Sequence, residues 1–424
     1  MATRRWLGTA AAVTQEVRLT PANVEIGDIF TATVNTKEVS FTATAATVAN
    51  VTAGFTTAWN NSTIPEFTEV TASDQTTYVK LLADTAGKPF TVTSAATNGG
   101  VAATETFTAA TQTAATGPNH WDDADNWSGN TVPVAADDVV FDQGSIDVKY
   151  GLSQSAITLT SLTRTMRYTG KIGLPEVNAD STSTYYEYRA TYLAISATTV
   201  TLSNTAGTGS GRFKLDTGSV QTTLIVQNTG TRTETEVPSF VWKGTHASNA
   251  LHLQKGDVGI AVYGSETATL LTINVGFVSS PQNDSDLYLG SGVTLTNVTL
   301  VQSGGEVEIN SATTGTATIV QYDGTLVIVS GGHVSLAVRG GTCYYSSTGT
   351  LGGNTIVSGK GSLSFDRDLR AKTVTNPIEI HGQEAKLSDR NKVVGSLIVD
   401  VNEGGNSANI ELGQNVRITR GTPA

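Results

Sequence analysis

Apolar and polar residues alternate over much of this chain. The alternation is clear in VEIGDIFTATV (24–34) and KEVSFTATA (37–45), and Asn35-Thr36 separates the two runs. A period of two residues is typical of a strand with one buried face, and a two-residue interruption is typical of a hairpin. The sequence therefore predicts a β-hairpin near its N-terminus.

The period changes directly after this hairpin. Within 46–63, Val48, Val51, Phe55 and Trp59 recur at spacings of three and four, which predicts one amphipathic helix. Three short strand candidates follow, each punctuated by Asp, Gly or Pro: 67–73, 76–84 and 88–96. We therefore expect a small α+β module over residues 18–109, preceded by an N-terminal arm (1–17) and followed by an uncharged linker (110–119).

From residue 120 onward the pattern becomes a repeat of short strands separated by small residues. VQSGGEVEI (301–309) aligns with VQYDGTLVI, VRGGTCYY and VSGKGSLSF, and the aligned glycines are Gly305, Gly324, Gly341 and Gly361. Their intervals are 19, 17 and 20 residues. A period near 19 with two or more strands in each repeat is typical of a solenoid. Glycine suits its tight corners because it tolerates positive φ.

Alternation within these strands identifies the buried face of the solenoid. The predicted inward pairs are Val307 with Ile309, Leu326 with Ile328, and Leu363 with Phe365. We expect a mainly β protein in which residues 120–424 form a long parallel β-helix. About 300 residues in repeats of about 19 would give on the order of 15 rungs, and a rod of about 70 Å at the usual strand spacing.

Composition narrows the functional classes. The formal net charge is −11, which argues against a nucleic-acid partner bound through a basic face. Cys343 is the single cysteine, so an intrachain disulfide cannot form. No stretch approaches the roughly 18 apolar residues of a membrane span, so no membrane association is expected.

An acidic, tryptophan-containing stretch, WDDADNWSGNTVPVAADDVVF (121–141), stands where the linker ends and the strand series begins. The open end of a solenoid exposes its core and unpaired backbone groups, and large apolar side chains can cover it. We therefore predict a structural cap formed by Trp121, Trp127, Pro133 and Phe141. The spacing of Trp121, Ala124, Asn126-Trp127-Ser128 and Pro133 resembles a motif that precedes β-helices in bacterial and phage-associated surface proteins.

A second resemblance concerns the N-terminal module. The segments GDIFTATVNTKEVSFTATA, AGFTTAWNNS and LLADTAGKPFTVT are similar to a ββαβββ module of structural proteins from tailed bacteriophages and prophages. The resemblance covers roughly a fifth of the chain and contains no catalytic signature. It implies a virion component, which would be a capsid decoration, a fibre or a spike, with other virion proteins as partners.

The sequence also contains candidate binding and catalytic residues. The tyrosines Tyr185, Tyr186, Tyr188 and Tyr192 could contact a partner or a host glycan by stacking, or could fold back on the solenoid flank. Glycoside cleavage requires two carboxylates. The candidate pairs are Glu306 with Glu308, Asp366 with Asp368, and Glu234 with Glu236. Few aromatic residues accompany these pairs, so we expect no catalytic residues.

Metal binding is a further alternative for the acidic stretch. Asp122, Asp125, Asp137 and Asp138 could meet in space around Ca²⁺, although the EF-hand pattern fails because Trp127 occupies the fifth loop position counted from Asp123. Neither a calcium-binding nonapeptide series nor a phosphate-binding loop is present. We expect no cofactor, with a loop-bound Ca²⁺ as the alternative.

These resemblances imply a non-enzymatic structural protein of a phage particle, and we expect a homo-oligomer. The N-terminal MATRRWLGTAAAV resembles an export signal, but its apolar run is too short, so assembly in the host cytoplasm is expected. Two alternatives are a secreted bacterial surface protein or adhesin with a β-helix, and a virion polysaccharide depolymerase.

Overall fold

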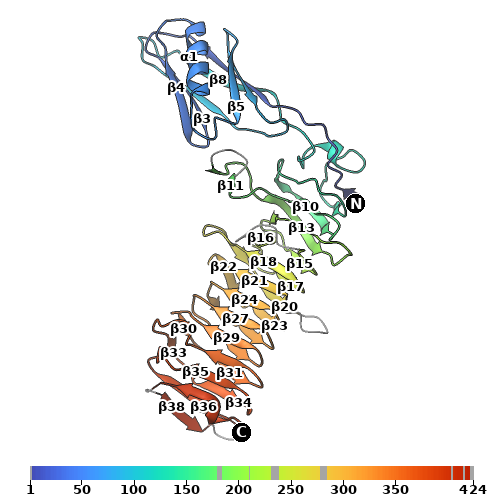
Figure 1. Ribbon diagram of the computed structural model, residues 1–424, viewed down its shortest axis with the longest axis vertical. Coiled ribbons are helices and arrows are strands. Elements are labelled where there is room, and N and C mark those ends of the chain that lie inside the picture. The colour runs from blue at the N-terminus through green and yellow to red at the C-terminus, as the bar shows by residue number, and fades with distance from the viewer. Residues whose placement is uncertain are drawn as a thin grey trace.

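The computed structural model describes residues 2–178, 184–209, 211–230, 238–276, 284–402, 404–413 and 416–420. The chain forms a long rod of stacked strands with a smaller module at one end (Figure 1). One α-helix lies in the module, and the rest of the described secondary structure consists of strands and two short 3-10 turns.

The rod contains two long ladders of parallel strands. The first ladder comprises β9 (Asp138–Phe141), β10 (Ser153–Arg164), β13 (Leu193–Leu202), β15 (Thr223–Val226), β17 (Ala250–Leu253), β20 (Thr272–Val275), β23 (Thr299–Gln302), β26 (Thr318–Gln321), β28 (Leu336–Val338), β31 (Thr355–Ser358), β34 (Ile378–His381), β36 (Leu397–Val401) and β38 (Val416–Arg420). The second comprises β14 (Phe213–Asp216), β16 (Phe240–Lys243), β18 (Gly256–Ile260), β21 (Ser285–Leu289), β24 (Glu306–Ile309), β27 (Thr325–Ile328), β29 (Thr342–Tyr345), β32 (Ser362–Ser364), β35 (Lys386–Asp389) and β37 (Ile410–Leu412).

The chain visits the two ladders in turn, so each circuit adds one parallel strand to both. Short strands form a third side, as β19 (Ala268–Thr269), β22 (Val293–Thr296) and β25 (Thr313–Thr314), and further along as β30 (Thr350–Leu351) and β33 (Thr373–Val374). The architecture is a parallel β-helix, which confirms the predicted fold class. With β1 (Thr3–Arg5), which pairs with β9, the first ladder has fourteen described strands and corresponds to a length of roughly 62 Å. This is shorter than predicted because several rungs carry long loops.

Strand register places like residues above one another inside the rod. Leu224, Leu251, Ile273, Leu300 and Ile319 are successive partners in the first ladder, and all are almost fully buried. In the second ladder the predicted inward residues are buried in the same way: Val307, Ile309, Leu326, Ile328, Leu363 and Phe365. Parallel register therefore builds one continuous apolar core, stabilised by burial of about 25 cal/mol per Å² of apolar surface.

Two buried glutamines interrupt this apolar core. Gln302 and Gln321 end their strands side by side, fully buried. The Gln302 Nε2 donates to the carbonyls of Gly305 (3.0 Å) and Thr325 (2.9 Å). The Gln321 Nε2 repeats this one rung later with Gly324 (2.9 Å) and Thr342 (3.1 Å). Each amide thus joins its own turn to the next rung, which helps to satisfy buried carbonyls at the corner.

The predicted corner glycines stack on each other. Gly305, Gly324 and Gly341 have φ of +71°, +85° and +70°. A Cβ on Gly324 would lie far inside van der Waals contact with the Gly305 carbonyl oxygen, and one on Gly341 would do the same to Gly324. Gly361 differs, because the positive φ of its turn falls on Gly359 (+57°). The corner therefore needs glycine both for its dihedral angles and for the close approach of successive rungs.

We expect Gly324→Ala to destabilise the rod by more than the roughly 1–2 kcal/mol that a left-handed conformation alone costs an L-residue. Gly382→Ala is the matched control, because φ there is +88° while the nearest atom to an added Cβ is 3.7 Å away. Denaturant unfolding of both variants measures the difference. Equal losses at the two positions would show that close stacking of the glycines contributes nothing.

An aromatic cluster covers the N-terminal end of the rod. Trp121 and Trp127 are fully buried, with ring centroids 4.6 Å apart, and Phe141 lies beneath them at 6.1 Å from Trp121 and 6.0 Å from Trp127. The Trp127 Nε1 donates to the Trp121 carbonyl at 2.7 Å. Pro133 is also buried. The short turn between the two tryptophans is a 3-10 helix, Ala124–Asn126, capped by the Asp123 side chain.

The N-terminal arm forms part of this cap, which the sequence did not predict. Strand β1 (Thr3–Arg5) pairs in parallel with β9, and the Trp6 ring lies 5.1 Å from that of Trp127. Asp137, buried beside β9, accepts hydrogen bonds from the Ala2 amide (2.9 Å) and Arg4 Nε (3.2 Å). Residues 3–6 therefore belong to the first rung of the solenoid, so the expected separate arm of residues 1–17 is wrong over this part.

We expect the double variant Trp121→Ala with Trp127→Ala to open the first rungs, because each truncation of a buried tryptophan costs about 3–5 kcal/mol. Hydrogen exchange of the β9 and β10 amides measures the opening. Trp59→Ala is the control, since Trp59 is equally buried but lies in the N-terminal module. Protection of β9 equal to that of the unsubstituted protein would contradict a capping role.

The N-terminal module packs one helix with two antiparallel sheets. One sheet has the order β5-β6-β2-β8 and the other β4-β3-β7, with bounds β2 (Glu16–Ala22), β3 (Ile29–Val34), β4 (Lys37–Thr42), β5 (Val70–Asp74), β6 (Val79–Ala83), β7 (Thr93–Thr97) and β8 (Thr106–Thr113). Helix α1 (Val48–Asn60) starts at the N-cap Thr47 and buries Val51, Phe55 and Trp59. Strand β8 extends into the predicted linker because its threonines and alanines pair with β2.

Candidate functional site

The predicted tyrosine cluster is divided between three environments. Tyr185 and Tyr192 are each 7% exposed, Tyr188 packs against the core of the N-terminal module, and Tyr186 is 80% exposed. Tyr185–Tyr186 (β12) pairs with Val177–Asn178 (β11) in a small hairpin that projects from the rod. Three of the four rings are therefore packed within the molecule, and Tyr186 is the exposed one.

Glu69 of the N-terminal module holds this hairpin. Its carboxylate accepts hydrogen bonds from Lys88 Nζ (2.6 Å), the Tyr185 hydroxyl (2.7 Å) and Arg189 Nη2 (2.9 Å). Arg189 also donates from Nε to the Pro89 carbonyl at 2.7 Å. Charge-assisted bonds of this kind are among the stronger ones in proteins. The bonds from Tyr185 and Arg189 join module and rod across 100–120 residues of sequence, and we call them the clamp.

The clamp has a defined pH dependence. Burial raises the pKa of Glu69, but the hydrogen bonds from Lys88 and Tyr185 and the charge of Arg189 outweigh it and leave the pKa below its ordinary value. The pKa of Glu69 is lower in the folded protein than in the unfolded chain. Glu69 therefore stabilises the folded protein at pH values above its unfolded-state pKa, and this stabilisation is lost as pH falls through its folded-state pKa.

We expect Glu69→Gln to lower the stability of the module by about 2 kcal/mol at neutral pH, because hydrogen bonds to a charged group are lost. The variant should also lose part of the acid sensitivity between about pH 5 and pH 2. Calorimetric melting across that range measures both effects, with Glu38→Gln, on an exposed glutamate, as the control. Parallel pH profiles for Glu69→Gln and the unsubstituted protein would contradict the clamp.

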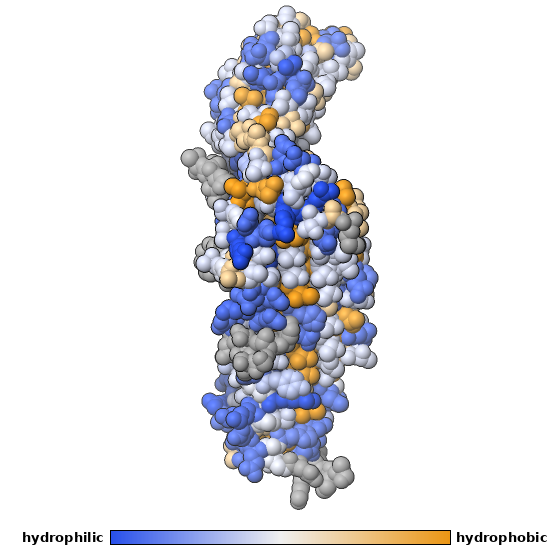
Figure 2. Space-filling view, turned by 90° about the vertical axis from the view of Figure 1, so that its right-hand side faces the viewer, coloured by the Kyte–Doolittle hydropathy of each residue, from blue (hydrophilic) through white to orange (hydrophobic). Residues whose placement is uncertain are grey.

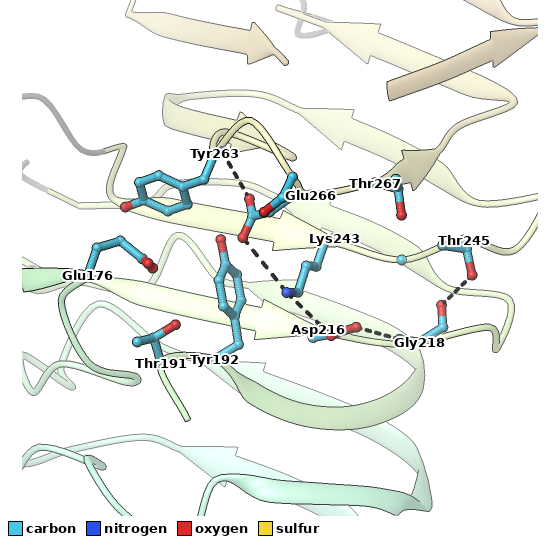
Figure 3. Close-up of a pocket in the computed structure, with 12 residues that line it drawn as sticks. Glu176, Thr191, Tyr192, Asp216, Gly218, Lys243, Thr245, Tyr263, Glu266 and Thr267 are labelled. Carbon is cyan, nitrogen blue, oxygen red and sulfur yellow. Dashed lines mark hydrogen bonds and ion pairs between the residues drawn. The ribbon is translucent and has the colours of Figure 1, made fainter. Parts of the chain in front are cut away.

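A hollow on the flank of the rod, of about 470 Å³, is the second feature of interest (Figure 3). We call it the flank pocket. Asp216 and Lys243 end β14 and β16 and are register partners, so their side chains lie one above the other. The loop 263–267 after β18 closes one side, and Glu176 and Tyr192 close another. Three successive rungs therefore build this pocket.

Ion pairs neutralise much of the charge in the flank pocket. The Lys243 Nζ lies 3.7 Å from Asp216 Oδ2 and 3.8 Å from Glu266 Oε1. The fully buried Lys214 pairs with Glu176. Burial lowers the pKa of Lys214, and the Glu176 carboxylate opposes that effect. Two lysines thus face three carboxylates across the pocket.

Two tyrosines lie among these charges. The Tyr192 ring has the Lys214 Nζ 4.5 Å and the Lys243 Nζ 4.2 Å from its centroid, distances typical of cation–π contacts. The Tyr192 hydroxyl is buried beside the Glu266 carboxylate. Burial, and secondarily the nearby Glu266, raise the pKa of Tyr192. Tyr263 is half-buried at the rim, and its backbone amide donates to Glu266 at 3.1 Å.

The carboxylate pairs proposed from the sequence do not form a cleft. Glu306 is exposed on the outer face of β24, and Glu308 accepts a hydrogen bond from Asn310 Nδ2 at 2.9 Å. Asp368 bonds to Arg370, whose guanidinium and backbone amide lower the pKa of that carboxyl to about 2. Such a group stays ionised at neutral pH and cannot donate a proton as a general acid. Glu234 and Glu236 lie outside the described residues.

The acidic residues proposed for Ca²⁺ bind different partners. Asp137 binds the N-terminal arm, Asp138 accepts from Ser161, and Asp122 pairs with His120 at 3.5 Å. Over the described ranges, no three His, Cys, Asp or Glu side chains are grouped to hold a metal ion. Cys343 is buried in the rod core, and burial raises the pKa of its thiol.

Sequence reasoning missed most of the flank pocket. Part of the pocket could have been predicted from FKLD (213–216) and FVWK (240–243). In both segments a charged residue lies in a strand whose other residues are typical of a buried strand. Aligning the two segments as neighbouring rungs places Asp216 on Lys243, as the register shows. The contributions of Glu176 and 263–267 come from loops of unequal length, which a repeat does not predict.

No family model, curated protein or solved structure matches this chain. In the part of the chain that the structure describes, no helix has the length and apolar character needed to cross a membrane. The fold and the geometry of these sites therefore carry the functional argument alone.

Proposed function

We propose that the chain is a non-enzymatic structural component of a phage particle, as a capsid decoration, fibre or spike. In this proposal the N-terminal module assembles with other virion proteins and the β-helix is the exposed surface or a host-binding rod. The observation that carries the proposal is the attachment of module to rod at two places, through the clamp at Glu69 and the pairing of β1 with β9. A doubly attached module suits a part that transmits position and force.

A line of apolar residues along the rod supports contact with a further copy or another virion protein. Val301, Val320, Ala337 and Ile356 are register partners on the outer face of the first ladder, and each is half-buried. Figure 2 shows apolar residues following a narrow line down this side of the rod between hydrophilic neighbours. Contiguous apolar surface rimmed by polar residues is typical of interaction sites. A homo-oligomer is therefore part of the proposal.

The state of the carboxylates favours binding over the depolymerase alternative. Asp368, one of the candidate carboxylates, is held ionised by Arg370. Retaining and inverting glycosidases need one carboxyl group that is protonated before the reaction. The secreted adhesin remains the second candidate, because an end-capped β-helix with an exposed flank suits a cell surface as well.

Mass spectrometry of purified particles tests the proposal directly. We expect this chain in stoichiometric amount in particles assembled in the host cytoplasm, with its N-terminal sequence uncleaved beyond Met1. Its recovery from the cell surface with no trace in particles would favour the adhesin. Release of reducing sugar from host capsule or lipopolysaccharide by the purified chain would instead favour the depolymerase.

A further inference from the structure

We propose that the flank pocket binds an uncharged saccharide segment of one or two sugar rings without cleaving it. This inference rests on the geometry of the pocket and stands whether the chain belongs to a virion or to a cell surface. The pocket volume of about 470 Å³ lies within the roughly 300–1,000 Å³ of protein ligand sites.

The polar groups of the flank pocket match a ligand that both donates and accepts hydrogen bonds at short intervals. Hydroxyl groups come from Thr191, Thr245, Ser265 and Thr267, and they alternate with the carboxylates and ammonium groups already described. None of the described lining residues is aliphatic or carries a purely apolar ring. A sugar presents hydroxyls around its ring, so it can satisfy such a lining, whereas a lipid or an apolar peptide cannot.

Charge selects an uncharged sugar. The lining carries Lys243 with the adjoining Lys214 against Glu176, Asp216 and Glu266, an excess of one negative charge, in a chain of net charge −11. Uronic acids and other anionic sugars would meet repulsion there, since like charges disfavour association. The internal ion pairs already satisfy the lysines, so an anion would have to displace a carboxylate.

The tyrosines of the pocket mark where an occupant would lie. The Tyr192 hydroxyl is buried among Glu176, Tyr263 and Glu266, with the Glu266 carboxylate as its hydrogen-bonding neighbour (Figure 3). The Tyr263 ring, half-buried at the rim with the Lys214 Nζ 5.0 Å from its centroid, is of the kind on which the C–H side of a sugar can rest.

The pocket is also fixed before binding. Asp216 accepts from the Gly218 amide at 2.9 Å, and Trp242 Nε1 donates to Thr217 Oγ1 at 3.1 Å. The first bond fixes the turn after β14 and the second joins two successive rungs, so little conformational entropy is lost when a ligand binds.

The test is binding of the full chain to an array of immobilised neutral oligosaccharides, built from hexoses and N-acetylhexosamines, with sialylated and uronic-acid glycans beside them. We expect binding to a subset of the neutral glycans. Tyr263→Ala should weaken that binding at least tenfold. Ser265→Trp, which fills the mouth from an exposed position and removes no interior contact, should abolish it.

Matched control variants distinguish a loss of binding at the pocket from a loss of folding. Tyr322→Ala removes another half-exposed tyrosine beside a cation, Arg339, and Thr348→Trp adds a tryptophan at an exposed position outside the pocket. Both should bind as the unsubstituted chain does, with melting temperatures close to it in all four variants. The proposal is overturned by no binding to neutral glycans, by binding only to acidic ones, by unchanged binding in Ser265→Trp, or by reducing-sugar release from a bound glycan. None of these results bears on whether particles contain the chain.

Discussion

The constraint on which this structure depends is that a parallel β-helix buries its core only along its length and not at its ends. Each rung satisfies its backbone groups on the rungs before and after it, and the first rung has no predecessor. Here the aromatic cluster of Trp6, Trp121 and Trp127 over Phe141 supplies the missing cover. The strand β1 supplies the missing hydrogen bonds to β9. The same junction carries the N-terminal module, so covering the end and attaching the module are one structural solution.

The repeat was predictable because its causes are local. Alternation in strands such as 306–309 and 325–328, and glycines at corners such as Gly305 and Gly324, follow from side-chain direction and backbone sterics that act within a few residues. The position of the helix over Val51, Phe55 and Trp59 was readable for the same reason. The motif at 121–141 also indicated that its two tryptophans are buried. It stands where the strand series begins, and large apolar rings at that point can cover the end of the solenoid core.

Features that depend on distant partners were not predictable in this way. Glu69 meets Tyr185 and Arg189 across more than one hundred residues, and no local pattern marks a carboxylate as the acceptor for all of them. The segment that contains Trp6 resembled an export signal. Its packing against Trp127 could not be predicted, because the two residues are also more than one hundred positions apart. The flank pocket combines strand ends, which the repeat orders, with loops whose lengths the repeat does not specify. The core of a solenoid can thus be predicted from its sequence, whereas the loops and attached modules outside the core depend on tertiary contacts.

The pairing of β1 with β9 changes how the chain is divided. Strand β1 belongs to the solenoid. The chain then forms the module with β2 to β8, and the solenoid continues at β9. The module is therefore an insertion within the first rung and not a domain joined end to end. Both of its connections return to the same rung, so it is tethered twice and cannot swing on a single strand. It is also a replaceable cassette, because any domain whose termini lie close together could occupy the same interval without breaking the ladder that follows.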